Sequence, residues 1–114
     1  MKYPNVRLRR LRENPKLRAL LSEHTLLLKE LIQPLFIKEG LSRPIEIPSM
    51  PGQYQWTLTT LAEEAVKIES LGISAVILFG IPQEKDIAGR LAFAKKGIVQ
   101  RAVAAIKKNV QSFL

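Results

Sequence analysis

The apolar residues of the chain follow two different spacings, which separate predicted helices from predicted strands. Between residues 57 and 71 they recur every three or four positions, as on one face of an α-helix. Thr57 is a suitable N-cap for this helix, Thr60 with Glu63 forms a second candidate capping box, and Gly72 is a good stop. A second stripe comprises Ile98, Val99, Ala102, Val103, Ile106 and Val110. We therefore expect two amphipathic helices.

Two other apolar runs are short and compact, which is typical of strands. Residues 32–37 form the first, with Pro34 near its entry, and residues 73–79 form the second, ended by Gly80 and Pro82. The second run does not alternate with polar residues, so we expect a parallel strand buried on both faces. With the helix between them, the two strands predict a right-handed βαβ unit.

The segments between these elements carry many glycines and prolines. Residues 38–56 predict an ordered loop, with a small hairpin that pairs residues 45–47 with residues 53–55. Residues 83–96 predict a charged loop. Residues 1–13 have no helical stripe and predict an extended arm, after which Asn14 and Pro15 predict the start of a short helix. Residues 26–31 predict a further helical turn.

Charge and composition limit the classes of function. The 18 Lys and Arg residues exceed the 10 Asp and Glu residues, which gives a net charge of +8, and the excess lies near both ends of the chain. Contact with nucleic acid is one reading, but the aromatic residues do not interleave with the basic ones, so a solvated surface is favoured. No apolar run is long enough to span a membrane, and the absence of cysteine agrees with a cytoplasmic location.

The predicted elements do not make a complete fold. Two parallel strands do not form a stable sheet by themselves. Two helices can cover one face of such a sheet but scarcely both faces. A closed (β/α)₈ barrel solves both problems but needs about 200 residues or more, whereas this chain has 114 and stops at Leu114 before a third strand. We expect an α/β fold that is the N-terminal fragment of a TIM barrel: an arm and short helix over 1–30, and the first two β/α units over 31–114.

Several segments, in order along the chain, resemble the porphobilinogen synthase family, also called δ-aminolevulinic acid dehydratases. Residues 31–37 resemble the family's first strand, and residues 47–54, with Met50-Pro51-Gly52, are similar to its signature stretch. The remaining matching segments are residues 9–20, 71–73, 77–82, 85–86, Gly89 and 97–102. After Gly89 the chain departs from the family, since Arg90-Leu91-Ala92 stands where Ser-Glu-Ala is typical, and Phe93 to Gly97 replaces an Asn-Pro-Asp/Glu-Gly run.

The resemblance implies a (β/α)₈ barrel whose N-terminal arm clasps a neighbouring subunit, usually in an octamer. It implies condensation of two molecules of 5-aminolevulinate into porphobilinogen, in tetrapyrrole and heme synthesis. Lysines on later strands perform this chemistry, at least one as a Schiff base, and zinc or magnesium assists in many members. None of those residues lies in this chain, so we expect no catalytic residue, metal ligand or cofactor here.

Few residues of the chain are candidates for a site. Phe79 ends the second strand, where it would line the pocket of a complete barrel, or it is a plain core residue. Arg9, Arg10 and Arg12 are candidates for the arm that grips a neighbour. We assign no catalytic or metal role to the remaining candidates, which are His24, Glu63, Glu64, Lys67, Lys95, Lys96, Lys107 and Lys108.

Three hypotheses follow from these residues. The chain is a truncated member of the family without activity of its own, for which 5-aminolevulinate would be a substrate only in the complete enzyme. Alternatively, it is an interaction module that self-associates, or that binds full-length synthase through its arm and an exposed strand edge. A basic nucleic-acid-binding fragment ranks last.

Overall fold

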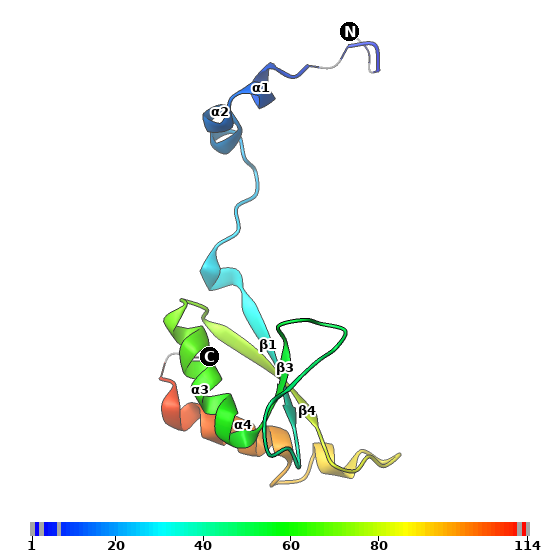
Figure 1. Ribbon diagram of the computed structural model, residues 1–114. Helices are drawn as coiled ribbons and strands as arrows, with labels where there is room; N and C mark the ends of the chain where they lie inside the picture. Colours follow the sequence, from blue (N-terminus) through cyan, green and yellow to red (C-terminus); the bar gives the residue numbers. More distant parts are fainter. Residues whose placement is uncertain (1, 3, 7, 112, 114) are drawn as a thin grey trace.

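The computed structural model describes residues 2, 4–6, 8–111 and 113. Its helices are α1 (Arg10–Glu13), α2 (Pro15–Leu20), α3 (Leu58–Ser70) and α4 (Ile98–Asn109). Its strands are β1 (Ile32–Lys38), β2 (Ile45–Glu46), β3 (Tyr54–Trp56) and β4 (Ala75–Ile81), and short 3₁₀ turns lie at Leu28–Glu30 and Arg90–Ala92. Figure 1 shows a compact body of sheet and helices, from which the N-terminal segment extends.

The strands form one open, mixed sheet in the order β2-β3-β1-β4. β1 and β4 are parallel and paired over their whole length, from Ile32 opposite Ala75 to Lys38 opposite Ile81, which confirms the predicted parallel strands. The predicted hairpin is confirmed as the antiparallel pair of β2 and β3. β3 also pairs in parallel with β1, so the hairpin extends the sheet, which the sequence pattern did not predict.

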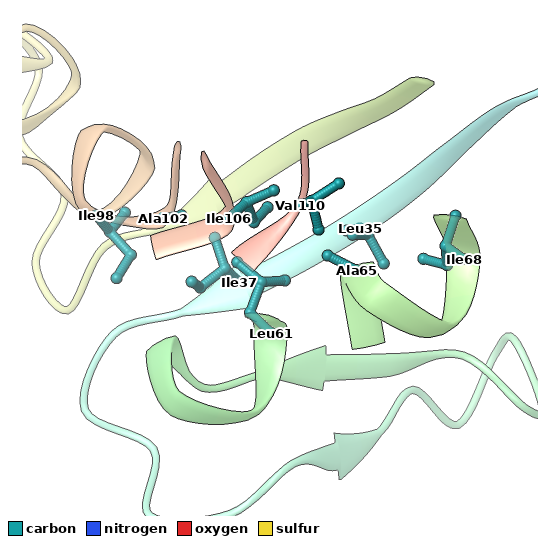
Figure 2. Close-up of a cluster of buried hydrophobic side chains, with 9 residues drawn as sticks. All are labelled: Leu35, Ile37, Leu61, Ala65, Ile68, Ile98, Ala102, Ile106 and Val110. Atoms are coloured by element: carbon teal, nitrogen blue, oxygen red, sulfur yellow. The ribbon is translucent and has the colours of Figure 1, made fainter. Parts of the chain in front are cut away.

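Both long helices cover the same face of the sheet. Figure 2 shows Leu35 and Ile37 of β1 facing side chains from α3 and α4. The buried cluster consists of Leu35, Ile37, Leu61, Ala65, Ile68, Ile98, Ala102, Ile106 and Val110. The two predicted helical stripes are thus confirmed as the sides of one core. Because no described residue forms a layer over the opposite face of the sheet, the core of the described part has two layers.

Local chemistry fixes where α3 begins and ends. The Thr57 hydroxyl accepts a hydrogen bond from the Thr60 backbone N–H at 3.2 Å, and the Thr60 hydroxyl accepts one from the Thr57 N–H at 3.2 Å. This pair forms the capping box of the helix, so Thr57 is confirmed as the N-cap, with Thr60 itself as its partner. Gly72 follows the helix with a φ of +89°, a conformation that favours glycine.

The predicted burial of the second strand on both faces is wrong for this structure. Ile77 and Phe79 of β4 are 48% and 46% exposed, because nothing among the described residues covers the face on which they lie. The strand also runs through Gly80 to Ile81 instead of ending before Gly80. Gly80 suits the strand because α4 passes close to it, and a Cβ there would lie 2.5 Å from Cγ2 of Val99.

The N-terminal segment stands away from the body (Figure 1). The Cα radius of gyration is 21.3 Å, whereas a compact chain of this length would have about 13 Å. Asn14 caps α2 through a 2.8 Å hydrogen bond from the Lys16 N–H, as predicted. The prediction of an extended arm over 1–13 is wrong at its end, since α1 begins at Arg10. Nearly all described side chains before residue 31 are exposed.

The predicted helical turn near residue 28 is confirmed as the 3₁₀ turn Leu28–Glu30. The prediction that the chain stops at Leu114 before a third strand concerns a residue outside the described part. Within the described part, no helix is both long and apolar enough to cross a membrane.

Candidate functional site

The uncovered face of the sheet is apolar and centres on two stacked phenylalanines. Phe36 of β1 lies opposite Phe79 of β4 in the parallel register, and their ring centroids are 5.3 Å apart with planes inclined by 20°. Side chains alternate along a strand, so Ile77 of β4 and Ile32, Pro34 and, at the carboxyl end, Lys38 of β1 lie on this face as well. We call this surface, made by Ile32, Phe36, Ile77 and Phe79, the phenylalanine face. It offers an apolar wall and no acid, base or nucleophile from these four residues.

A groove of about 310 Å³ lies between β4 and α4. Among the described residues β4 pairs with β1 alone, so the groove follows the free edge of the sheet. Its lining is apolar apart from one lysine, and consists of Val76, Ile77, Leu78, Val99, Val103, Ile106, Lys107, Val110 and Phe113. We call this feature the β4 groove. It presents unpaired strand backbone beside an apolar helix surface, which is a surface suited to another strand.

A second cleft, of about 390 Å³, lies beyond the carboxyl end of β4, between the 83–97 loop and the start of α4. Its wall includes Gly80, Pro82 and Asp86. The Asp86 carboxylate accepts a hydrogen bond from the Arg90 N–H at 2.9 Å and lies 3.5 Å from Nε of Arg90. Arg90, which departs from the family pattern, thus pairs with Asp86 within the same loop. The side chains of this ion pair are largely exposed.

An ion pair that the sequence pattern did not reveal joins the ends of both parallel strands to α4. Glu39 follows β1, and its carboxylate accepts a hydrogen bond from Nη2 of Arg101, which lies on α4. The Glu39 N–H donates to the Ile81 carbonyl at 2.9 Å, and its second carboxylate oxygen accepts from the Gln83 N–H at 3.4 Å. The partners are 62 residues apart in sequence, so no local spacing could have indicated this pair.

The remaining residues considered from the sequence do not converge on a site. Arg9, Arg10 and Arg12 are exposed near the far end of the N-terminal segment. Arg12 is tied there through its carbonyl, which accepts from Nη1 of Arg18 at 2.7 Å. His24 is exposed. The five lysines weighed from the sequence are all exposed on helices or loops, and Lys67 among them lies 3.4 Å from Glu64; they are Lys67, Lys95, Lys96, Lys107 and Lys108.

The described residues do not fit a metal site. No group of three or more His, Cys, Asp or Glu side chains among them lies close enough to hold an ion. The full sequence contains no cysteine and one histidine, so it cannot supply a thiolate site.

Comparison with known proteins shows that the chain is similar to the members of one protein family. The model of the family described as delta-aminolevulinic acid dehydratase matches residues 5–114. A delta-aminolevulinic acid dehydratase of Methanothermus sociabilis is 46% identical over 109 residues, which are 96% of this chain and 34% of the relative. One from Synechocystis is 44% identical over 108 residues, which are 95% of this chain and 33% of the relative.

A solved structure is also similar. It is a delta-aminolevulinic acid dehydratase (porphobilinogen synthase) of Toxoplasma gondii in complex with the reaction product porphobilinogen. The TM-score is 0.86 at 32% identity, over 96% of this chain and 31% of that one. The chain thus spans about a third of the length of the relatives that it matches.

Proposed function

We propose that this chain, which belongs to the delta-aminolevulinic acid dehydratase family, supplies the opening β/α units of a porphobilinogen synthase barrel and one wall of its substrate site. The observation that carries the proposal is the family match over residues 5–114. The division into an arm over 1–30 and barrel units over 31–114 belongs to the same proposal.

The geometry of the sheet supports a barrel origin. β1 and β4 are parallel, and both helices lie on one face, as in the outer layer of a (β/α)₈ barrel. In such a barrel the uncovered face turns inward, and catalytic sites lie at the carboxyl ends of the strands. Phe79 is two residues from the end of β4 on the uncovered face, which supports its role as a wall of that site.

The complete protein would convert 5-aminolevulinate to porphobilinogen in tetrapyrrole synthesis, and the cytoplasm would be its compartment. The similar protein of Toxoplasma gondii was solved with porphobilinogen, the product of this reaction. The chain itself would be inactive, because a Schiff-base lysine needs a desolvated site, whereas the helix and loop lysines weighed above are exposed and Lys38, at the end of β1, is only half-buried. Zinc or magnesium would be held by residues other than the described residues of this chain.

The N-terminal segment supports a role in assembly. Leu8 and Leu11 are 82% and 62% exposed beside Arg9, Arg10 and Arg12, on a segment with few contacts to the body. Apolar side chains on a projecting segment gain burial when they pack on another subunit. We propose that this segment grips a neighbouring subunit, with the three arginines at its contact.

A chimera tests the proposed function. This chain replaces the corresponding third of the Methanothermus sociabilis relative, and porphobilinogen formation from 5-aminolevulinate is measured beside the unaltered relative. We expect a folded chimera that forms porphobilinogen. A chimera that folds and assembles like the relative but forms none would overturn the proposal.

A further inference from the structure

We infer that the ammonium group of Lys38 binds a carboxylate of the substrate at the carboxyl end of the sheet, with the phenylalanine face as the apolar wall beside it. The inference rests on the proposed function, and it adds a residue that determines which ligands this part of the site accepts. The class of ligand is a short aliphatic acid, to which 5-aminolevulinate belongs.

Lys38 is the last residue of β1 and lies on the uncovered face of the sheet. Side chains alternate along the strand, so Lys38 lies on the same side as Phe36, two residues before it. In the parallel register Lys38 is opposite Ile81, the last residue of β4, just as Phe36 is opposite Phe79. In a β/α barrel, ligands bind at this end of the strands, so the ammonium group would lie at the mouth of the site.

The charge of Lys38 has no ion-pair partner among the described residues. Its acidic neighbour in sequence, Glu39, is engaged on the helix side, where its carboxylate pairs with Arg101 of α4. The other ion pairs of the described part join Lys67 to Glu64 and Arg90 to Asp86. A half-buried ammonium group beside an apolar surface favours an anionic ligand, because a charge-assisted hydrogen bond replaces part of its lost hydration.

The surroundings of Lys38 fit an aliphatic acid better than an anion with several charges. Lys38 is the only charged residue of β1 and β4, and its neighbours on the uncovered face include Phe36, Phe79 and Ile81. A ligand site of this kind has a mostly apolar wall and a few polar groups that fix orientation. In 5-aminolevulinate the carboxylate follows two methylene groups, which would lie along the aromatic rings while the carboxylate reaches Lys38.

The inference uses the charge of Lys38 and not its nucleophilicity. A Schiff base needs a neutral amine in a desolvated site, whereas Lys38 is half-buried. Arginine keeps the positive charge but does not form a Schiff base with a ketone. Lys38→Arg therefore separates a lysine that binds a carboxylate from a lysine that attacks a carbonyl.

Ligand binding to the chimera with the Methanothermus sociabilis relative tests the inference. Calorimetry measures the dissociation constants of levulinate, which carries the carboxylate, and of the neutral 4-oxopentanamide. Their ratio reports the preference for the charged ligand. Lys38→Met should lower this preference about tenfold, because it removes one charge-assisted contact. Lys38→Arg should keep the preference within about threefold of the original.

An exposed lysine provides the matched control. Lys108 lies on α4, on the helix side of the sheet, and has no ion pair among the described residues. Lys108→Met should leave the preference unchanged. If Lys38→Met lowers the melting temperature of the chimera, Lys38→Gln replaces it and should change the preference in the same direction.

Steady-state kinetics give a second measurement. Lys38→Met should raise KM for 5-aminolevulinate about tenfold with little change in kcat, because the contact to a carboxylate that does not react is equally strong in the ground state and the transition state. Lys38→Arg should retain turnover.

Each outcome decides for or against this role of Lys38. An unchanged preference in Lys38→Met overturns it, as do an equal change in Lys108→Met and a chimera that binds neither ligand. Abolished turnover in Lys38→Arg also overturns it, because Lys38 would then act as a nucleophile. A chimera that forms porphobilinogen but whose preference does not depend on Lys38 refutes this inference and leaves the proposed function intact. An inactive chimera whose preference depends on Lys38 does the reverse.

Discussion

Gly80 is the position at which one added carbon should disturb the body most measurably. It lies in β4 opposite Ile37 of β1, where α4 crosses the sheet. A Cβ at residue 80 would lie 2.5 Å from Cγ2 of Val99 and 2.9 Å from Cγ2 of Ile98. Both atoms belong to β-branched side chains, which have little freedom to rotate away in a helix.

The expected magnitude follows from these distances. Carbon atoms pack at about 3.5–4.0 Å, so α4 would have to withdraw from the sheet by roughly 1 Å. Overpacking of this kind typically costs about 1–3 kcal/mol. The withdrawal would also loosen Ala102 and Ile106, which are buried against β1 and α3 on the same helix. We therefore expect Gly80→Ala to lower the free energy of unfolding by about 2 kcal/mol.

Urea denaturation of the isolated chain, followed by circular dichroism, measures this change. Val99→Ala removes the atom that is closest to the new Cβ, so the double mutant Gly80→Ala/Val99→Ala separates the contact from other effects. In the Val99→Ala background, the cost of Gly80→Ala should fall by about 0.5 kcal/mol or more. An unchanged cost in that background, or no cost in the original chain, would refute the close packing of α4 on β4.

Three further predictions concern the core, the ion pair and the phenylalanine face. Leu61→Ala, at a fully buried position, should lower the free energy of unfolding by about 2–5 kcal/mol in calorimetry. Leu20→Ala, at a position 80% exposed, should change it by less than about 0.5 kcal/mol, and similar losses from the two variants would contradict the placement of Leu61 in the core. Glu39→Gln should lower the free energy of unfolding by at most about 1 kcal/mol, and by less in high salt, because the ion pair of Glu39 with Arg101 is partly exposed. A larger loss that does not depend on salt in urea titrations would contradict this prediction. Phe79→Ala in the chimera should lower kcat/KM about tenfold while Phe79→Leu retains more activity, and unchanged steady-state kinetics would remove Phe79 from the substrate site.

The main elements were predictable because their burial is periodic. The stripe of Leu61, Ala65 and Ile68 recurs at helical spacing since one side of α3 faces the sheet, and the stripe of α4 arises in the same way. The short apolar runs of β1 and β4 reflect parallel strands with apolar residues on both faces. Short-range chemistry also gave the caps of α2 and α3, at Asn14 and Thr57.

The features that were missed depend on contacts between distant segments. The pairing of β3 with β1 depends on the return of a long loop to the sheet, which no local residue spacing indicates. The burial expected for Ile77 and Phe79 assumes a layer on both faces of the sheet, whereas the described residues supply one. The Glu39–Arg101 pair joins an end of β1 to α4, so it becomes visible only once the sheet and helix are packed.

The placement of Phe79 and of the arginines Arg9, Arg10 and Arg12 as site residues remains a prediction. The register explains why Phe79 lies on the uncovered face, because Phe36 stands opposite it. What would approach that face, or the N-terminal segment, depends on residues beyond this chain. The sequence alone therefore identifies the family through its ordered segments, whereas these contacts require an assembled protein.

The most direct test of the account is porphobilinogen formation by the isolated chain. The purified chain is incubated with 5-aminolevulinate, with added zinc or magnesium, and compared with buffer and with the Methanothermus sociabilis relative. We expect product from the relative and none above buffer from the chain. Product from the chain, absent after replacement of Lys38 at the end of β1, would contradict the claim that the chain carries part of the architecture of this enzyme without its chemistry.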